Sequence, residues 1–414
     1  MVPDSPNTRP AIVADSTPVP ITNDTIAMPP AVPTGIGEFD RVLGGGLVPG
    51  SLTLVGGEPG IGKSTLMLQA AHRIALQHGP VLYVSGEESF QQTRMRADRL
   101  GAVDDNLMLL TETNVDAIGK HFEKGTYAFV VIDSIQSVYS VQLNSVPGSV
   151  GQVRECANEF LRLSKGSGVP FLLVGHVTED GSIAGPRTLE HLVDTVLYFE
   201  GEGKQVLRIL RGFKNRFGST NEIGVFEMTG TGLDEVANPS ALFLQERPKG
   251  PSGSVVFPSI AGTRPVLVEV QSLVTDSHLS SPRRTVSGVN ANRLALVLAV
   301  LEKRADLRLS DKDIFVNVAG GVRLDEPAAD LAVALALASS LHDRPVADDM
   351  MAFGELGLAG EVRAVNMARP RIAEGSKFGF KTCILPPGCV SDAQTPSMQL
   401  LGAVGIGAAL EYAL

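Results

Sequence analysis

The sequence has few cysteines and no long apolar run, and each of these absences excludes some classes of protein. Only three of its 414 residues are cysteines, Cys156, Cys383 and Cys389, which fits a reduced cytoplasmic chain better than a disulfide framework. Cys383 and Cys389 have no second cysteine pair, so a zinc site of four cysteines is excluded. Because no apolar run reaches about 18 residues, we expect no membrane span.

The sequence also lacks a basic excess. Its formal net charge is −10, which argues against a nucleic-acid binder unless the cations are concentrated locally. The N-terminus shows no basic stretch followed by an apolar core, so we expect no secretory signal. Hydrophobic residues make up 43% of the chain and charged residues 19%, which permits sizeable buried cores.

Composition and pattern divide the chain into three parts. Residues 1–32 are rich in Pro, Thr, Asp and Ala without periodicity, which predicts a disordered tail. Residues 33–237 predict an α/β domain, and residues 238–414 predict a separate α+β domain. The length agrees, since domains average roughly 150 residues.

Short apolar runs alternate with helical patterns in the first domain. Such alternation predicts a buried parallel sheet. Three closely spaced runs that follow predict an antiparallel extension of that sheet. The expected strands are 51–57, 81–86, 107–111, 128–134 and 170–176, the expected helices are 63–79, 89–101, 114–125 and 153–168, and the extension is 193–201, 204–212 and 222–230.

The second domain mixes both patterns. Two apolar runs at 253–260 and 265–274 predict a β-hairpin. Further helices are expected at 292–306, 326–342 and 369–380, and further strands at 313–321, 350–358, 360–366 and 381–386.

A phosphate-binding loop stands out in the first domain. The stretch GEPGIGKS follows a predicted strand and opens a helix, as a phosphate loop requires. Its glycines let backbone N–H groups point at phosphate oxygens, and the helix N-terminus adds partial positive charge. Lys63 is expected to reach the β- and γ-phosphates and Ser64 to ligate Mg²⁺. The predicted nucleotide-binding residues are Gly57, Glu58, Pro59, Gly60, Ile61, Gly62, Lys63, Ser64 and Thr65.

Polar residues end the neighbouring strands. Asp133 follows four apolar residues, and at that strand end it is expected to hold Mg²⁺. Glu87 and Glu88 follow another strand, and one of them would orient the attacking water; the alternative is a helix N-cap cluster. His176 ends a third strand and would sense the γ-phosphate, unless it is an ordinary turn histidine.

The stretch FKNRFGSTNE puts Lys214 and Arg216 beside a strand end. Together with GEPGIGKST, YVSGEES, VVIDSIQ and GHVTEDGSIAGPRTLEH, its core KNRFG closely resembles the bacterial RadA/Sms family of DNA-repair proteins. The resemblance runs from about Thr34 to the C-terminus. It implies an α/β fold with a RecA-like P-loop ATPase domain and a C-terminal α+β domain like that of the Lon protease.

The resemblance also implies roles for single residues. RecA-like ATPases bind ATP between subunits of a ring or filament, so Lys214 and Arg216 would reach a neighbour's γ-phosphate like an arginine finger. The alternative is a solvated basic turn. Glu87, rather than Glu88, matches the glutamate that activates water. The segments after Asp133 and His176 match DNA-facing loops, with Gln152, Arg154 and Arg187 as candidate contacts.

The C-terminal part resembles a protease without its dyad. Ala328 occupies the position of the nucleophilic serine and Arg369 that of the lysine. Alanine carries no nucleophile, and arginine does not lose its proton, so proteolysis is not expected. The domain would serve assembly and DNA contact, with candidate cations Arg283, Arg284, Arg293, Lys312 and Arg323, each of which could equally be a solvated surface charge.

One feature departs from the family. RadA proteins usually begin with a four-cysteine zinc module, whereas this sequence has no cysteine before Cys156. We therefore expect ATP and Mg²⁺ as cofactors but no zinc, with the module either lost naturally or cut from this chain.

The resulting prediction is a DNA-dependent ATPase. By resemblance it would form a hexameric ring on single-stranded and branched DNA and drive branch migration with the RecA recombinase. The rival readings are an ATP-dependent protease and a RecA-like signalling ATPase that never touches DNA.

Overall fold

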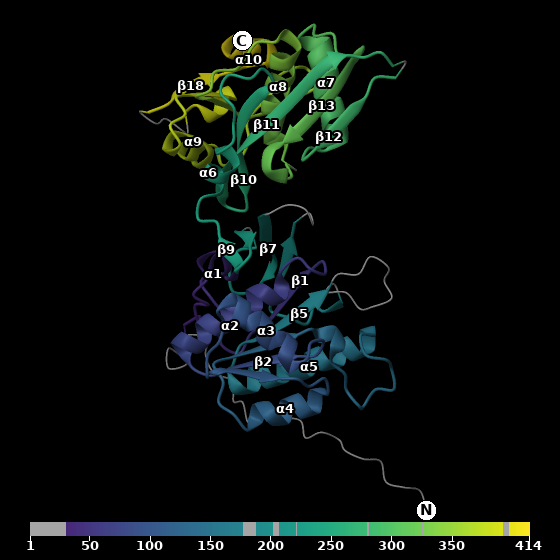
Figure 1. Ribbon diagram of the computed structural model, residues 1–414. Helices are drawn as coiled ribbons and strands as arrows, with labels where there is room; N and C mark the ends of the chain where they lie inside the picture. The colour runs from purple at the N-terminus through teal and green to yellow at the C-terminus, as the bar shows by residue number, and fades with distance from the viewer. Residues whose placement is uncertain are drawn as a thin grey trace, which may run out of the picture.

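The computed structural model describes residues 30–176, 188–201, 207–220, 222–279, 281–324, 326–391 and 397–414. The predicted tail therefore lies outside the described residues except for its end, where Val32 already pairs with Leu47. The remaining chain forms two lobes that meet at a narrow waist (Figure 1). Each lobe is built around its own sheet.

The first sheet has nine strands in the order β3-β2-β4-β5-β1-β6-β7-β8-β9. Its first five strands pair in parallel, as the alternating pattern predicts. The apolar residues of β1, β2, β4 and β5 are buried on both faces, because helices cover both sides, whereas those of the edge strand β3 are only partly buried. The strands are β1 (Leu52–Gly57), β2 (Val81–Ser85), β3 (Leu107–Leu110), β4 (Phe129–Asp133) and β5 (Phe171–His176).

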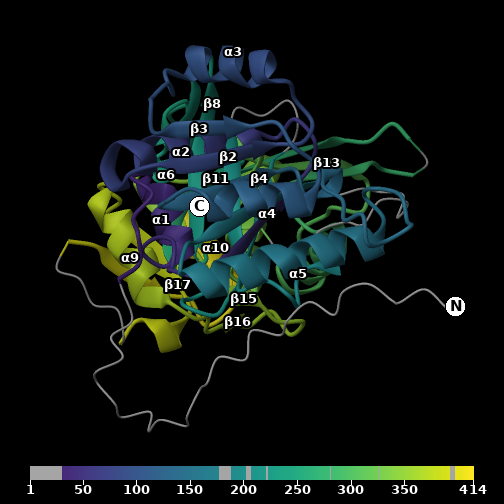
Figure 2. The same cartoon turned by 90° about the horizontal axis from the view of Figure 1, so that it is seen from below.

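The helices divide between the two faces of this sheet. On one face α1, α2 and α3 pack over Val55 and Val131; on the other, α4 and α5 pack over Leu52 and Leu54. Seen from below, α5 and α3 lie on opposite sides of the strands (Figure 2). The helices are α1 (Gly37–Leu43), α2 (Lys63–His78), α3 (Phe90–Leu100), α4 (Val115–Glu123) and α5 (Val150–Ser167), with a 3-10 turn η1 (Ile135–Ser137).

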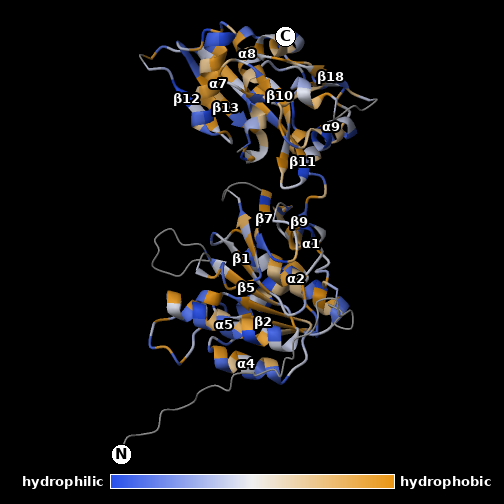
Figure 3. Cartoon of the chain, turned by 180° about the vertical axis from the view of Figure 1, so that it is seen from behind, coloured by the Kyte–Doolittle hydropathy of each residue, from blue (hydrophilic) through white to orange (hydrophobic). Residues whose placement is uncertain are grey.

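Local sequence fixes where several of these helices begin. Ser89 accepts a hydrogen bond from the backbone of Gln92, whose side chain accepts one in return, so a capping box starts α3. The side chain of Asn114 accepts hydrogen bonds from the backbone N–H groups of Asp116 and Ala117 and so caps α4. The hydropathy colouring shows apolar strands in the middle of the lobe and mixed helices outside (Figure 3).

The predicted antiparallel extension is present, and its first strand joins the rest of the sheet in parallel. Only β6 to β9 pair antiparallel with one another, whereas β6 itself runs parallel to β1. Gly57 therefore lies opposite Phe199, and Asn215 lies at the other end of β6, opposite Thr195. The strands are β6 (Thr195–Glu200), β7 (Leu207–Asn215), β8 (Ile223–Thr229) and β9 (Gly232–Glu235).

The second sheet has seven strands in the order β12-β13-β11-β10-β14-β17-β18. The predicted hairpin is its centre, because β10 (Ser254–Ala261) and β11 (Arg264–Asp276) pair antiparallel. Helix α8 is apolar all round and packs on these strands. The other strands are β12 (Arg284–Ser287), β13 (Lys312–Val318), β14 (Met350–Ala352), β17 (Thr382–Leu385) and β18 (Gln399–Gly402).

The elements around this sheet are mostly at the predicted positions. The expected helix at 326–342 begins as a 3-10 turn, and the expected strand at 350–358 is split, since its second half pairs in a separate two-stranded sheet. The helices are α6 (Pro239–Leu244), α7 (Ala291–Arg304), α8 (Asp330–His342), α9 (Ala368–Lys377) and α10 (Ile406–Ala413); the turns are η3 (Ala319–Gly321), η4 (Pro327–Ala329) and η5 (Pro387–Cys389); the small sheet is β15 (Glu355–Leu356) and β16 (Val362–Arg363).

A buried ion pair connects the two lobes at the waist. Both carboxylate oxygens of Glu38 accept hydrogen bonds from Arg264 at 3.0 Å, and one also accepts the backbone N–H of Val225. Arg264 also donates to the carbonyl of Ala237. Glu38 belongs to α1 and Arg264 to β11, so this pair ties the first lobe to the centre of the second sheet.

Candidate nucleotide site

The phosphate loop lies between β1 and α2 and encloses the side chain of Lys63. That side chain is buried, with 3% of its residue surface exposed. Its Nζ donates to the carbonyls of Gly57 and Glu58, both at 2.7 Å. Burial lowers the pKa of Lys63 to about 8, and the carboxylates of Asp133 and Glu87 oppose that shift. The ammonium is therefore held at the base of the loop, close to its titration range.

Glycine is required at two places in the loop. Gly62 has φ 115°, and a Cβ there would lie 2.8 Å from Met228 Cε. A Cβ on Gly57 would lie 2.7 Å from the carbonyl oxygen of Phe199. Sequence reasoning missed a further support: Arg208, on β7, donates to the carbonyl of Ile61 at 3.2 Å. The antiparallel extension therefore supports the phosphate loop through this contact from β7.

The two candidate carboxylates point to different partners. Glu87 accepts a hydrogen bond from Ser134, and its Oε1 lies 3.5 Å from His176 Nε2. Glu88 pairs instead with Arg96 of α3. The hydrogen bond from His176 makes the larger contribution to lowering the pKa of Glu87, and the bond from Ser134 makes a smaller one. Together they lower this pKa to about 2, although burial opposes the shift. Glu87 is thus an ionised acceptor at neutral pH.

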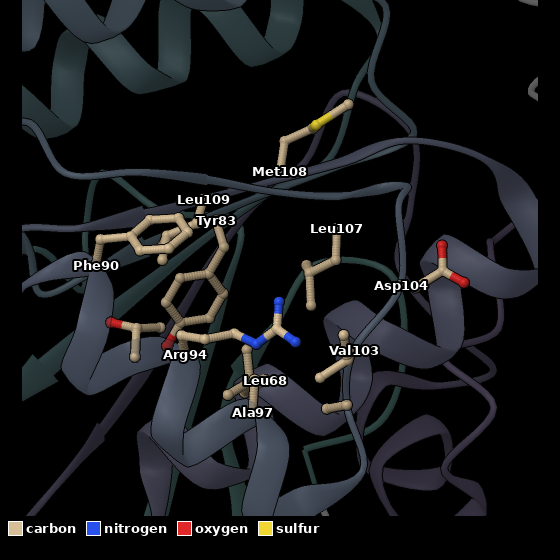
Figure 4. A pocket seen from close by; sticks show the side chains of 12 residues that line it. Leu68, Tyr83, Phe90, Arg94, Ala97, Val103, Asp104, Leu107, Met108 and Leu109 are labelled. Carbon is tan, nitrogen blue, oxygen red and sulfur yellow. The ribbon is translucent and has the colours of Figure 1, made fainter.

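Asp133 is held by a tyrosine that sequence reasoning also missed. Tyr83, on β2, donates its hydroxyl to Asp133 Oδ2 at 2.6 Å. Burial, and then the Asp133 charge, raises the pKa of Tyr83 well above its usual value. The ring of Tyr83 also lines a separate apolar pocket with Phe90 and Met108 (Figure 4). Tyr83 therefore joins that pocket to the strand end that carries Asp133.

These groups line one cavity of about 530 Å³. Lys63, Ser64, Asp133, Glu87 and His176 all contribute to its wall. The donor set suits Mg²⁺ and a triphosphate: hydroxyl and carboxylate oxygens for the hard cation, and an ammonium with loop N–H groups for the anion. Within the described residues, His176 Nδ1 is buried without a hydrogen-bond partner, which leaves a polar atom at this edge for a ligand or water.

Lys214 and Arg216 lie away from this cavity. Because β7 runs antiparallel to β6, they stand beside Thr195 and Val196, at the end of the sheet opposite Gly57. Lys214 Nζ donates to the carbonyls of Glu190 and Val193, and Arg216 pairs with Asp194 at 3.1 Å. Burial and the Arg216 charge lower the pKa of Lys214. Neither cation faces the phosphate loop of its own chain.

The residues of the first lobe that are candidate DNA contacts differ in how exposed their side chains are. Gln152 is buried, with 1% of its residue surface exposed. Its side-chain amide forms hydrogen bonds with the backbone of Ser140, Leu143 and Ser145. It holds the 140–145 segment, so a direct contact from its side chain to DNA is not expected. Arg154 lies on the exposed side of α5. Arg187 lies outside the described residues.

Most candidate cations of the second lobe have acidic or backbone partners. Arg293 donates to the buried Asp330 at 2.8 Å and also contacts Glu355. Lys312 pairs with Asp276. Arg284 donates to the carbonyls of Arg283, Lys312 and Leu309. Arg283 and Arg323 are exposed. Among these candidates, Arg293 has its main contacts with acidic side chains of its own lobe, so we interpret it as a structural cation.

The surroundings of Ala328 bear on the protease comparison. Ala328 is buried in η4, and its carbonyl accepts the backbone N–H of Gly354. Arg369 is exposed, whereas Arg371 is buried and pairs with Glu326. The guanidinium of Arg371 also lies 5.7 Å from the ring of Phe353. Arg371 therefore contacts Glu326, just before Ala328, and the match of Arg369 to the lysine position stays a prediction.

Two features of the described residues concern metals and membranes. No group of three or more His, Cys, Asp or Glu side chains gathers there. None of the described helices combines the length and apolarity needed to cross a bilayer.

Comparison with known proteins finds family models and relatives that match this chain. A family model described as AAA domain matches residues 37–182, and one described as Subunit ChlI of Mg-chelatase matches residues 289–388. DNA repair protein RadA of Bacillus subtilis (strain 168) is 50% identical over 398 residues, which covers 96% of this chain and 87% of that protein. DNA repair protein RadA of Streptococcus pneumoniae is 51% identical over 374 residues, covering 90% and 89%. A crystal structure of the RadB recombinase is 25% identical and covers 49% of this chain and 98% of its own, with a TM-score of 0.39.

Proposed function

The chain belongs to the RadA family of DNA repair proteins, and from this premise we propose that it is a DNA-dependent ATPase that processes recombination intermediates and promotes branch migration. Its first domain is an ATPase domain. The observation that carries the proposal is the single cavity that gathers Lys63, Ser64, Asp133, Glu87 and His176. Each of these residues has a place in an in-line attack of water on the γ-phosphate.

The roles follow from the contacts. Lys63 binds the β- and γ-phosphates, because its ammonium lies at the base of the loop. Ser64 and Asp133 would hold Mg²⁺, which when bound neutralises charge on the phosphate oxygens. Glu87 orients the attacking water through its ionised carboxylate, while Ser134 and His176 fix that carboxylate. His176 thereby links the γ-phosphate edge of the site to the chain that follows it.

The site is proposed to be completed by a second subunit. Lys214 and Arg216 stand at the far end of the sheet from the loop of their own chain, so they support a site shared between neighbours. In a hexameric ring, these cations would meet the γ-phosphate bound to the next subunit and stabilise the charge of the transition state.

The proposed substrates are single-stranded and branched DNA, engaged in the cytoplasm together with the RecA recombinase. The loop at 140–149, anchored by Gln152, would face DNA, with Arg154 and Arg187 as the cations of that side. The second domain, residues 238–414, would contribute assembly and DNA contact without proteolysis, because Ala328 carries no nucleophile and Arg369 does not lose its proton.

The Lys214→Ala variant tests the shared site. Turnover should fall at least about 100-fold, because a finger cation acts only in the transition state. The dissociation constant for ATP, measured with a fluorescent analogue, should change by less than about threefold. Unchanged turnover would remove Lys214 from the catalytic set.

A second candidate function is a RecA-like signalling ATPase without a DNA substrate. It is favoured by the acidic net charge and by the partners that neutralise cations of the second lobe, such as Asp276 and Asp330. The salt dependence of DNA binding separates the two candidates, because phosphate contacts release counterions. A steep loss of affinity with salt supports the DNA-dependent ATPase, and an absence of binding at low salt supports the signalling ATPase.

A further inference from the structure

A buried carboxylate lies directly behind Arg216. Asp194 precedes β6 and is only 2% exposed. Its Oδ2 accepts the backbone N–H of Leu52 at 3.1 Å and Lys165 Nζ at 2.9 Å. Its Oδ1 accepts a hydrogen bond from Arg216 at 3.1 Å. Leu52 and Lys165 thus fix the carboxylate to β1 and α5 and leave the other oxygen to orient the guanidinium.

The same short segment also holds the backbone of the cation pair. The carbonyl of Asp194 accepts the backbone N–H of Arg216 at 3.2 Å. The carbonyls of Glu190 and Val193 accept Lys214 Nζ at 2.7 and 2.8 Å. Residues 190–194 therefore contact both cations, and Asp194 is the member of this segment that does so through its side chain.

The contact with Asp194 leaves Arg216 able to bind a second anion. The side chain of Arg216 is 54% exposed, although it is paired with a buried acid. A guanidinium has five N–H donors in a rigid fork, and Asp194 engages one of its terminal nitrogens. A long flexible side chain held at one point also loses less entropy when it binds.

We propose that Asp194 is the positioning residue of the Arg216 finger: it holds the guanidinium so that its remaining donors face the neighbouring subunit. The inference rests on the proposed shared site. It assigns to Asp194 the preorganisation that makes such a cation effective, since a cation already in place costs no reorganisation when charge develops. The effect belongs to the transition state and not to the binding of ATP.

The Asp194→Asn variant separates this role from simple support of the fold. The amide oxygen of asparagine can still accept from Leu52 and Lys165, so the bonds to β1 and α5 are preserved. Its NH₂ group then faces the guanidinium of Arg216. Both groups are hydrogen-bond donors, so no hydrogen bond forms between them. The substitution therefore removes the hydrogen bond to the finger while keeping size and shape.

The first experiment is a double-mutant cycle of ATP turnover with Asp194→Asn and Arg216→Ala. Asp194→Asn should lower kcat about 10- to 100-fold and change the ATP dissociation constant less than about threefold. In the Arg216→Ala background the same substitution should change kcat less than about twofold, because there is no finger left to position. An equal loss in both backgrounds, or no loss in the wild-type background, would overturn the proposal.

A matched control checks the effect of losing a buried carboxylate as such. Glu159 is also buried, lies on α5 and pairs with Arg162. Glu159→Gln should lower the melting temperature without lowering kcat. If Glu159→Gln lowered kcat as much as Asp194→Asn, the effect would be one of stability, and the positioning role would be refuted.

Mixed assemblies distinguish failure of this inference from failure of the shared site. Lys63→Ala subunits keep intact fingers, and Asp194→Asn subunits keep an intact phosphate loop. Their mixture should hydrolyse more ATP than either variant alone, as should a mixture of Lys63→Ala and Lys214→Ala. Recovery only in the Lys214→Ala mixture would overturn the role of Asp194. Recovery in neither would refute the shared site, and the role of Asp194 with it.

Discussion

Burial and hydrogen bonds set the charge state of single residues in the candidate site. Lys63 is desolvated in the loop, so its pKa is lowered to about 8. Glu87 is turned toward His176 and Ser134, so its pKa is lowered to about 2. One group is thus close to titration near neutral pH, and the other remains charged.

ATP affinity should therefore depend on the protonation of Lys63. Below pH 8 the ammonium is present, and above it the free protein holds a neutral amine, whereas bound phosphates favour the charged form. Affinity should fall as pH rises past this value, approaching about tenfold per pH unit. A pH series of dissociation constants checks this, and an affinity that stays constant through the alkaline range would contradict it. Glu87→Gln removes a carboxylate that raises the Lys63 pKa, so it should move the fall to lower pH.

Tyr83→Phe should weaken the Mg²⁺ site. Loss of the 2.6 Å hydrogen bond frees Asp133 to rotate, and the concentration of Mg²⁺ giving half-maximal turnover should rise about 3- to 10-fold. The apolar pocket keeps its ring, so stability should fall by only about 1 kcal/mol. A magnesium titration of turnover measures the effect. An unchanged requirement for Mg²⁺ would show that Asp133 needs no support from Tyr83.

Among the elements, the direction of β6 decides the geometry. Because β6 runs parallel to β1, the hairpin to β7 carries Lys214 and Arg216 to the end of the sheet remote from the phosphate loop. The opposite direction would have placed them beside the loop of their own chain. A single strand orientation therefore separates the two halves of the proposed shared site.

Gln152→Ala should release the 140–145 segment from α5. Its amide makes four hydrogen bonds to the backbone of that segment. Two of them reach the buried Ser140, whose backbone groups left unpaired would cost about 1–3 kcal/mol. Hydrogen exchange should become faster in that segment and remain unchanged in α2. Arg154→Ala, two residues away on the exposed side, is the control and should leave exchange unaffected. Equal protection in Gln152→Ala would show that other contacts hold the segment.

The sequence predicted the alternating elements well, because glycine turns and apolar runs are local signals. The phosphate loop and Asp133 followed from the same signals. Tyr83 and Arg208 could not be found in this way, since their roles arise from contacts across strands that only the folded sheet brings together. The sequence likewise could not show that Arg371, two residues after Arg369 on the same helix, is the buried cation of the two.

The whole molecule consists of two lobes that meet at a narrow waist (Figure 1). The buried pair of Glu38 and Arg264 connects α1 with the second sheet. A nucleotide bound on the first lobe and a contact made by the second would communicate through this waist.

Arg264→Ala should weaken that link. It leaves the buried Glu38 with only the longer ion pair to Arg41, at 3.5 Å, which costs about 3 kcal/mol. Thermal unfolding followed by calorimetry should then resolve into two transitions, one for each lobe. Glu361, whose partner Arg363 lies on the surface of the second lobe, offers the control: Glu361→Gln should leave the unfolding profile unchanged. A single undisturbed transition in Arg264→Ala would mean that other contacts join the lobes.

The most direct test of the proposed function is ATP hydrolysis with and without single-stranded DNA, using Lys63→Ala as the blank. A DNA-dependent ATPase should show turnover that rises at least about fivefold with DNA and loses the increase at high salt. Turnover above the blank that is the same with and without DNA would contradict the account.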